Sequence, residues 1–498
     1  MNVNPITRLD YPDPDVIRVE DTYYMVSTTM HFMPGCEILQ SFDLVHWEHV
    51  TYVYETLDHT DAQQLKSGQN IYGQGMWAAS LRYHEGRFYI CFVANDTRKT
   101  YLYTSEKIDG PWKKQLIEGF YHDASLLFDE DGRNYIVYGN DEIWITELNE
   151  DLTAPKKDGL HRLLVSDHKN PELGYEGSHI QKINGYYYIF LIHSLRDRWM
   201  RTEACFYSDS LEGEFTGGDV LCDDRGYCGQ GVAQGGIVDT PDGKWYAMLF
   251  QDSGAVGRIP ILLPVTWKDH FPVFGQNGHV PEEIEVHSTR PGYIYQPLVG
   301  SDDFCNGLLP RWQFNHDPDP RYYHLDALQG TYTITTREVC TELTQAVNTL
   351  TQRMSYPSCA AEVTVDASAL KEGDVAGLCA LQSCYAAVGI TKHHGKYEVL
   401  MLDKKEDGIL DMTEGTVVES HQMDFRLEAD FCNMKDEARC YYRVNKGDWL
   451  PIGTVHKLYF KLDHFTGCRF GLFCYAAEET GGSACFRDFK YYDVDEIS

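Results

Sequence analysis

The chain has 498 residues, of which 43% are hydrophobic and 24% are charged, a composition typical of a folded protein. A single hydrophobic core seldom grows beyond about 300 residues, so we expect at least two domains. With 43 basic and 75 acidic residues, the net charge is −32. Such a surface repels phosphate backbones and anionic lipids, which argues against nucleic acid and membrane partners. A homo-oligomer is compatible with this composition.

The amino terminus, M-N-V-N-P-I-T-R-L-D, lacks the basic stretch and apolar core of a secretion signal, and no run of about 18 uncharged apolar residues follows it. We therefore expect a cytoplasmic protein. The 15 cysteines are scattered singly from Cys36 to Cys485, without a C-x-x-C pair. This spacing favours reduced thiols over a disulfide framework or a zinc site.

A motif recurs five times in the first 250 residues: a turn dipeptide followed by an aromatic, β-rich run. The copies read V-E-D-T-Y-Y-M-V, H-E-G-R-F-Y-I-C-F, E-D-G-R-N-Y-I-V-Y, I-N-G-Y-Y-Y-I-F-L and P-D-G-K-W-Y-A-M-L. Each predicts the tip and second strand of a β-hairpin. The shared tyrosines lie 65, 46, 53 and 58 residues apart, close to one four-stranded blade with variable loops. We therefore predict an all-β chain in which residues 1–298 form a five-bladed β-propeller.

Each copy also has a residue that begins the first strand of its hairpin, eleven or twelve positions before the tyrosine. In a propeller these positions face the same end of the channel. Three of the five are carboxylates, and clustering them in a channel costs free energy, which favours a functional site over a structural acid cluster. The five residues are Asp13, Trp77, Asp123, Glu176 and Gln234.

The segment D-Y-P-D-P-D-V, residues 10–16, places Asp13 between two prolines, which hold the backbone extended and outside a regular strand ladder. Asp123 and Glu176 lie on neighbouring blades, so one of the two is expected to stay protonated and act as a general acid. Asp13 is two blades away and is expected to stay ionised, with room for a water molecule. Inverting glycosidases need carboxyl groups roughly 6.5–9.5 Å apart for that water, so the arrangement favours inversion.

From about residue 299 the pattern changes to alternating strands such as C-A-A-E-V-T-V-D and K-Y-E-V-L-M-L, with hairpin tips at H-H-G-K and N-K-G-D. Such a run of about 200 residues predicts two packed antiparallel sheets. We expect residues 299–498 to form this β-sandwich domain.

The first 300 residues resemble glycoside hydrolase family 43 in segments such as N-P-I-T-R-L-D-Y-P-D-P-D-V-I-R-V, G-M-W-A-A-S-L, D-A-S-L-L-F-D-E-D-G-R-N-Y and Y-E-G-S-H-I-Q-K-I-N-G-Y-Y-Y. The resemblance implies a five-bladed propeller with Asp13 as general base, Asp123 as modulator of the acid's pKa and Glu176 as general acid. Arg258, in G-A-V-G-R-I-P, matches an arginine that reaches the substrate. Residues 299–498 resemble the family's concanavalin A-like, jelly-roll sandwich.

Further substrate contacts are expected from Trp77, which offers an apolar platform for a sugar face, and from Gln234 and Phe32. In the family's xylosidases the sandwich lends a loop to the pocket, and the segment Phe314 to Tyr323 is our candidate. No cofactor is expected to be required. Some members place a metal-linked histidine before the fifth-blade glycines, and Ala233 at that place argues against a central calcium ion.

The sequence thus predicts an exo-acting, inverting glycosidase for short oligosaccharides. The segment G-G-I-V-D-T-P-D-G-K-W-Y-A-M-L-F-Q-D is nearer the arabinofuranosidase branch, which favours release of terminal α-L-arabinofuranosyl units from arabinoxylo- or arabino-oligosaccharides. A β-D-xylosidase, or an enzyme with both activities, is the alternative. A sugar-binding propeller without catalysis is a third reading, which loss of one of the three acids would have favoured.

Overall fold

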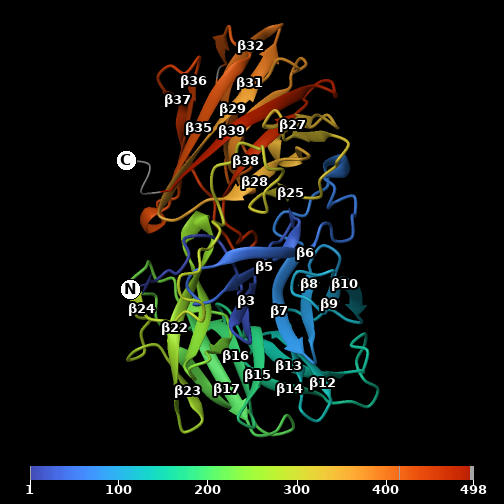
Figure 1. The fold of residues 1–498 in the computed structure, drawn as a ribbon, viewed down its shortest axis with the longest axis vertical. Helices are drawn as coiled ribbons and strands as arrows, with labels where there is room; N and C mark the ends of the chain where they lie inside the picture. The colour runs from blue at the N-terminus through green and yellow to red at the C-terminus, as the bar shows by residue number, and fades with distance from the viewer. Residues whose placement is uncertain (1, 414, 494–498) are drawn as a thin grey trace.

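The computed structural model describes residues 2–413 and 415–493. It confirms the five-bladed propeller and the concanavalin A-like sandwich: the propeller occupies the lower half of Figure 1 and the sandwich the upper half. The regular structure of the described residues is strands and four short 3-10 turns, η1 Lys66–Gly68, η2 Gly254–Val256, η3 Leu343–Gln345 and η4 Cys432–Met434. The described part of the chain contains no helix with the length and apolar character of a membrane span.

Each blade is an antiparallel sheet built from consecutive strands. The first blade contains β2 Asp15–Val19, β3 Thr22–Val26, β5 Gly35–Ser41 and β6 Glu48–Tyr54. The second contains β7 Met76–His84, β8 Arg87–Ala94, β9 Lys99–Ser105 and β10 Lys113–Ile117. The third contains β11 Ser125–Phe128, β12 Asn134–Asn140, β13 Glu142–Leu148 and β14 His161–Ser166. The fourth contains β15 Glu176–Ile183, β16 Tyr186–Ser194, β17 Arg201–Ser208 and β18 Thr216–Leu221. The fifth is β19 Val232–Ala233, β20 Ile237–Asp239, β21 Trp245–Asp252, β22 Arg258–Lys268 and β23 Phe271–Phe274. A small pair, β1 Asn2–Val3 with β24 Glu283–Ile284, ties the amino terminus to the chain that follows the fifth blade.

Two sheets face each other in the sandwich. One contains β33 Leu410–Met412, β34 Thr416–Val418, β32 Lys396–Lys404, β31 Tyr385–His393, β30 Val375–Leu381, β38 Arg469–Tyr475, β28 Leu350–Arg353 and β25 Gln313–Asn315, and ends on β4 Phe32–Met33, which belongs to the first 298 residues. The other contains β26 Tyr323–Asp326, β27 Thr331–Thr335, β39 Ser483–Asp493, β29 Ser358–Asp366, β35 Gln422–Asp430, β36 Glu437–Arg443 and β37 Leu450–Lys457. Backbone pairing of β25 with β4 therefore joins the two domains.

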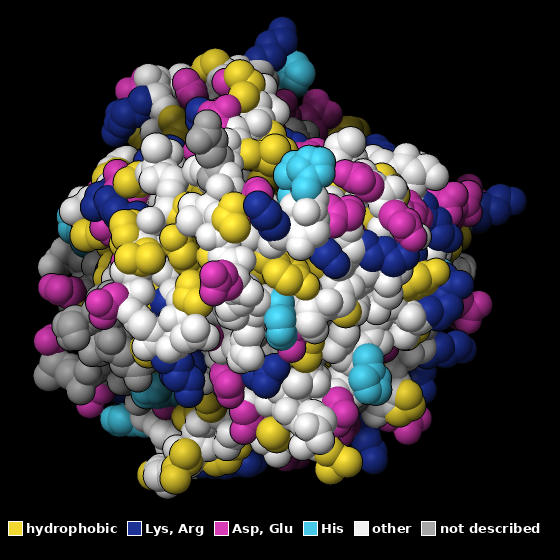
Figure 2. Space-filling view, turned by 90° about the horizontal axis from the view of Figure 1, so that it is seen from above, with side chains coloured by type: hydrophobic (Ala, Val, Ile, Leu, Met, Phe, Trp, Pro, Cys, Tyr) yellow, Lys and Arg dark blue, Asp and Glu magenta, His cyan; other side chains and the backbone are white. Residues whose placement is uncertain are grey.

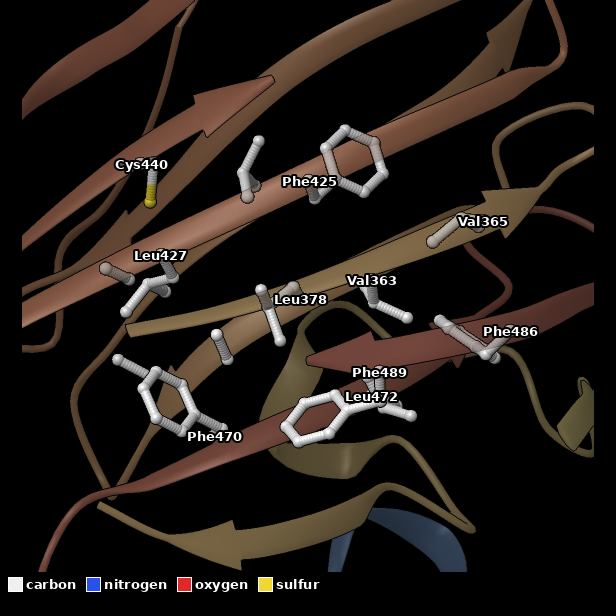
Figure 3. Packing of buried hydrophobic residues seen from close by; sticks show 14 of the residues in the cluster. Val363, Val365, Leu378, Phe425, Leu427, Cys440, Phe470, Leu472, Phe486 and Phe489 are labelled. Carbon is white, nitrogen blue, oxygen red and sulfur yellow. The ribbon is translucent and has the colours of Figure 1, made fainter. Parts of the chain in front are cut away.

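Burial follows the position of each strand. β16 is buried along almost its whole length because a middle strand of a blade packs against neighbouring blades on both faces. β35 alternates between buried and partly exposed residues, since only one face of its sheet meets the core. Figure 3 shows that core: Val363, Leu378, Phe425, Leu427 and Phe470 come from both sheets and point toward one another.

The surface carries charged side chains of both signs, and the cysteines are free thiols. Figure 2 shows acidic and basic side chains interspersed on the face seen from above. All fifteen cysteines are free in the described structure, as their spacing predicted. Nine of them are buried, where a thiol acts as a small apolar group.

Candidate active site

A cavity of about 230 Å³ opens at one end of the propeller channel, at the boundary with the sandwich. Six residues singled out from the sequence line it: Asp13, Trp77, Asp123, Glu176, Gln234 and Arg258. All five blades contribute a wall residue, because the repeated strands start at the same height around the axis. The propeller therefore brings together residues that are far apart in the chain, such as Asp13 and Arg258, which are 245 positions apart.

The backbone at this height shares one unusual feature. In every blade a residue within three positions of the start of the first strand has positive φ, a conformation that is uncommon outside glycine and is concentrated at functional sites. Asp13 thus differs from the extended backbone expected between its two prolines. The five residues and their φ angles are Asp13 (52°), Ala78 (34°), Asp123 (46°), Gly177 (64°) and Gln234 (61°). At Gly177 a side chain would meet Gln234, whose Cδ lies 2.7 Å from the position of an added Cβ.

Asp13 is held at both carboxylate oxygens. Thr28 Oγ1 donates to Oδ2 at 2.5 Å, and Arg258 Nη1 donates to Oδ1 at 2.7 Å. Thr28 in turn accepts from the backbone N–H of Ala78 at 2.8 Å. Asp13 is only 3% exposed, so these charge-assisted hydrogen bonds fix its direction toward the cavity.

Asp123 and Glu176 form a close pair with His122, which the sequence reading did not single out. His122 Nε2 lies 3.4 Å from Glu176 Oε2 and 3.6 Å from Asp123 Oδ2. Asn140 Nδ2 donates to Glu176 Oε2 at 2.7 Å, and the N–H of Gly177 donates to Asp123 Oδ2 at 3.1 Å. The predicted adjacency of the two acids is present in the structure.

The charges of this group are coupled. Burial, together with the charges of Glu176 and Asp13, raises the pKa of Asp123 to about 6 against the opposing effect of His122. Burial also acts to raise the pKa of Glu176, but the hydrogen bond and charge of His122, with Arg201 and Arg258, leave that pKa below its usual value. Burial lowers the pKa of His122, yet the two carboxylates raise it to about 9. Of the two acids, it is therefore Asp123 whose pKa is raised, whereas the family resemblance gave the role of general acid to Glu176.

These three side chains could also place ligand atoms around one metal ion, because their nearest nitrogen and oxygen atoms lie within 4.8 Å of one another. The set contains an imidazole and two carboxylates that are already paired with it. Calcium prefers six to eight oxygen ligands, so this donor set does not suit it. Ala233, at the place of the metal-linked histidine, is fully buried in β19 and offers no ligand.

Two buried arginines complete the charged wall. Asp252 bridges them: its Oδ1 lies 3.2 Å from Arg258 Nε and its Oδ2 lies 2.8 Å from Arg201 Nε. Because Arg258 also binds Asp13, a continuous chain of ion pairs runs from Arg201 to the predicted base. Arg201 lies at the first position of β17 and was not predicted from the sequence.

The sandwich closes the cavity with Leu462 and Phe465, from the segment between β37 and β38. The Phe465 ring lies 3.7 Å from Arg258 Cζ and 5.1 Å from the Trp77 ring. Asp10 fixes this segment beside the propeller, since its carboxylate accepts from the N–H groups of Gly467 and Arg258, both at 2.7 Å. Hydrophobic and aromatic walls with a few fixed polar groups are typical of ligand sites.

Two expectations about this wall were wrong. The segment Phe314 to Tyr323 does not line the cavity: Phe314 is in the sandwich core, and His316 packs against His31 at the domain boundary. Phe32 does not line it either. It is 2% exposed, belongs to β4 and has Arg469 Cζ 3.5 Å above its ring. Its pairing with β25 gives Phe32 a role in joining the domains, which a sequence without the sandwich register could not reveal.

Below the cavity the same inner strands carry a second polar layer. Asp15 Oδ2 accepts from Arg82 Nη1 and from the N–H of Leu81, both at 2.8 Å, and Oδ1 lies 3.1 Å from His179 Nδ1. Arg82 also donates to Ser125 Oγ at 2.6 Å. The charged groups of this layer are thus paired with one another.

The comparisons with known proteins agree with this architecture. The profile of glycosyl hydrolases family 43 matches residues 3–272, and that of the β-xylosidase C-terminal concanavalin A-like domain matches residues 301–492. A solved chain from Bacteroides eggerthii, described as a bifunctional GH43-CE protein, is 42% identical with a TM-score of 0.91. The match covers all of this chain and 64% of that one, so this chain spans less than two thirds of its length.

Two curated relatives carry different activity names. A β-xylosidase from Formosa agariphila is 26% identical over 99% of this chain and 89% of its own length. A non-reducing end α-L-arabinofuranosidase from Bacteroides ovatus is 24% identical over 82% of this chain and 79% of its own. With the family profile matching more than half of the residues on a five-bladed propeller, the chain belongs to glycosyl hydrolases family 43 and is a glycoside hydrolase with a carbohydrate substrate.

Proposed function

We propose that this protein is an exo-acting, inverting enzyme that releases terminal α-L-arabinofuranosyl residues from oligosaccharides. The observation that carries the proposal is the convergence of Asp13, Asp123 and Glu176 on one cavity of about 230 Å³. At ~30 Å³ per water this is room for about eight water molecules, which suits one terminal sugar. Leu462 and Phe465 narrow the same cavity from the sandwich side, which favours chain ends over internal bonds.

In this proposal Asp13 is the general base. Its two hydrogen bonds, from Thr28 and Arg258, hold the carboxylate toward the cavity, where it can take a proton from the attacking water. Glu176 is the general acid that protonates the leaving oxygen, and Asp123 orients the sugar and modulates the pKa of its neighbour. Trp77 and Phe465 supply apolar surface for the sugar ring.

The acid step needs a proton on Glu176, whose pKa is lowered in the free site by His122. We assign the supply of this proton to His122. Its Nε2 lies 3.4 Å from Glu176 Oε2, so the proton moves from Nε2 to Oε2 and then to the glycosidic oxygen as that bond breaks. The neutral imidazole left behind is partly exposed to the cavity and regains a proton from water.

A second candidate is release of terminal β-D-xylosyl units. The Formosa agariphila relative named as a β-xylosidase favours it, as the Bacteroides ovatus relative favours the arabinofuranosidase. The two sugars present ring oxygen and hydroxyl groups in similar places, so the same wall residues serve both.

The test compares sugar release from 4-nitrophenyl α-L-arabinofuranoside and 4-nitrophenyl β-D-xylopyranoside, with proton NMR of the first product anomer. We expect faster release of arabinose, with inverted configuration. Faster release of xylose would establish the second candidate, and a product of retained configuration would refute inversion. If neither sugar is released while free arabinose or xylose binds, the sugar-binding propeller is the correct reading.

A further inference from the structure

Arg201 is the most deeply buried charged side chain in the wall of the cavity. It is 1% exposed, and its guanidinium carbon lies 5.2 Å from the Trp199 ring and 5.3 Å from the Phe250 ring. A Cβ added at Gly231 would come within 1.8 Å of the Arg201 carbonyl oxygen, so the backbone of the neighbouring segment packs directly against it. The ion pair with Asp252 and the two aromatic rings hold the side chain in place.

The hydrogen-bond capacity of Arg201 is only partly used. Its Nε lies 2.8 Å from Asp252 Oδ2 as an ion pair, but neither Nε nor Nη1 makes a hydrogen bond with the described residues. Leaving a buried donor unsatisfied costs free energy, and a charged donor costs more. Arg258 differs, because its Nη1 is bound to Asp13 and its Nε lies beside Asp252. Arg201 is therefore the arginine of this wall whose buried donors lack a hydrogen-bond partner among the described residues.

The electrostatics of the wall define the acceptor. Asp252 already neutralises Arg201, and the Glu176 carboxylate is a second negative charge near it. An anionic sugar would meet Glu176 and Asp13 in the same cavity, and like charges in a buried site are costly. A neutral hydroxyl accepts a charge-assisted hydrogen bond without adding charge.

We propose that Arg201, which lines the cavity, binds the terminal sugar by donating a hydrogen bond from its guanidinium group to one of the sugar hydroxyl groups. This inference rests on the proposed function and deepens it, since it assigns a specificity-determining contact to a neutral sugar in the catalytic cavity. The contact rejects analogues that lack the hydroxyl, because the buried donor would then stay unpaired.

The test pairs Arg201→Met and Arg201→Lys with nitrophenyl glycosides that each lack one hydroxyl. In the parent, one of these deletions should lower kcat/KM by about 10- to 100-fold. In Arg201→Met, kcat/KM for the intact glycoside should fall by a similar factor. Removing the same hydroxyl from the substrate should then lower kcat/KM of this variant by less than about threefold. The kcat/KM of Arg201→Lys should lie between those of the parent and Arg201→Met, because lysine keeps a cation near Asp252 but lacks the planar guanidinium group.

A purely structural role predicts a different pattern. If Arg201 only neutralises the charge of Asp252, removing any one sugar hydroxyl should lower kcat/KM by the same factor in Arg201→Met as in the parent. That result would overturn the proposal. Arg198→Met serves as the control for removal of an arginine from the same blade, since Arg198 is exposed, and its kinetics should match the parent. A glycoside of the matching uronic acid should react more slowly than the neutral sugar, and a preference for it would contradict the neutral acceptor.

A binding measurement separates this proposal from the proposed function. Titration calorimetry of free arabinose and xylose, in a Glu176→Gln background, requires no turnover. Binding that is about tenfold weaker or more in Arg201→Met supports the contact even if neither nitrophenyl glycoside is cleaved. Equal binding with and without Arg201 overturns it even if the enzyme is active.

Discussion

The two polar layers of the propeller channel are built by the same strands and behave differently. The upper layer holds Asp13, Asp123 and Glu176 and faces the cavity. The lower layer holds Asp15 and Arg82, and its groups bind one another. Asp13 comes two residues before β2 and Asp15 is the first residue of that strand, so nearby positions of one short segment serve the two layers.

Charge and burial alone do not distinguish these layers. Asp15 is as deeply buried as Asp13, and although burial acts to raise its pKa, Arg82 and His179 hold that pKa below its usual range. The pKa of Asp123 is raised because neighbouring carboxylates add to the effect of burial. What separates a catalytic layer from a structural one is hydrogen-bonding capacity that remains open to a cavity.

The largest effect is expected for Asp13→Asn. The amide cannot accept the proton of the attacking water, so kcat/KM should fall by up to about 10⁴-fold, on good and poor leaving groups alike. Nitrophenyl glycosides and natural oligosaccharides should be compared. A covalent glycosyl-enzyme trapped on any carboxylate would contradict the inverting role.

Glu176→Gln keeps the shape of the side chain and removes the transferable proton. Turnover of natural oligosaccharides should fall by about 10²–10⁴-fold, and aryl glycosides, whose leaving groups need little protonation, should lose much less. The ratio of the two losses is the measurement. Equal losses on both substrates would show that Glu176 is not the proton donor.

Arg82→Met tests the lower layer. It leaves the buried Asp15 carboxylate without its main partner, and breaking a buried ion pair typically costs about 3–5 kcal/mol of unfolding free energy. Chemical denaturation should report this loss, while kcat per folded molecule should change less than about threefold. A large fall in kcat with unchanged stability would show that the lower layer also takes part in catalysis, and would contradict its structural role.

Asp123→Asn acts on the pKa of the acid. Removing the negative neighbour should lower the pKa at which the proton shared by His122 and Glu176 is lost, so the alkaline limb of the pH–rate profile should move down by about one pH unit. The value of kcat/KM should also fall at every pH because a contact with the sugar is lost. An alkaline limb that stays in place or moves upward would contradict the coupling between these groups.

The smallest effect concerns a third buried polar group, at the domain boundary. His31, His316 and His464 pack together, and burial lowers the pKa of His316 to about 3 and of His464 to about 4. Burial and the other two rings likewise lower the pKa of His31. They do not line the cavity, so their unused nitrogen atoms should affect stability and not catalysis.

The direction in which stability changes with pH follows from proton binding by the folded and unfolded chains. Between about pH 4 and the unfolded value near 6.5, the unfolded chain binds protons that the folded chain does not, so stability should fall as pH decreases through this window. Each histidine contributes up to about 1.4 kcal/mol per pH unit. His31→Phe should flatten the dependence of the thermal midpoint on pH, with unchanged kcat. A slope identical to that of the parent would show that His31 does not remain neutral.

Much of the candidate site was predictable because it lies on a repeat. Five hairpins of similar length place their first-strand residues at one height, so Asp13, Asp123 and Glu176 could be brought together from spacing alone. His122 precedes Asp123 directly, and its position in H-D-A-S-L was the one local signal that could have marked it. Arg201 has no such signal, because it comes from the third strand of its blade.

The sequence by itself determined the blade count, the change of pattern near residue 299 and the ring of acids, because β-strand alternation and turn chemistry are local properties that repeat along the chain. Only the tertiary structure decided which sandwich residues close the cavity and that Arg201 lines it with buried donors that have no hydrogen-bond partner among the described residues. Phe465 enters the site because Asp10 holds the backbone of Gly467, and Phe32 leaves it because β4 pairs with β25. Both contacts join residues more than 250 positions apart, and such pairings depend on the packing of whole domains, which no local pattern encodes.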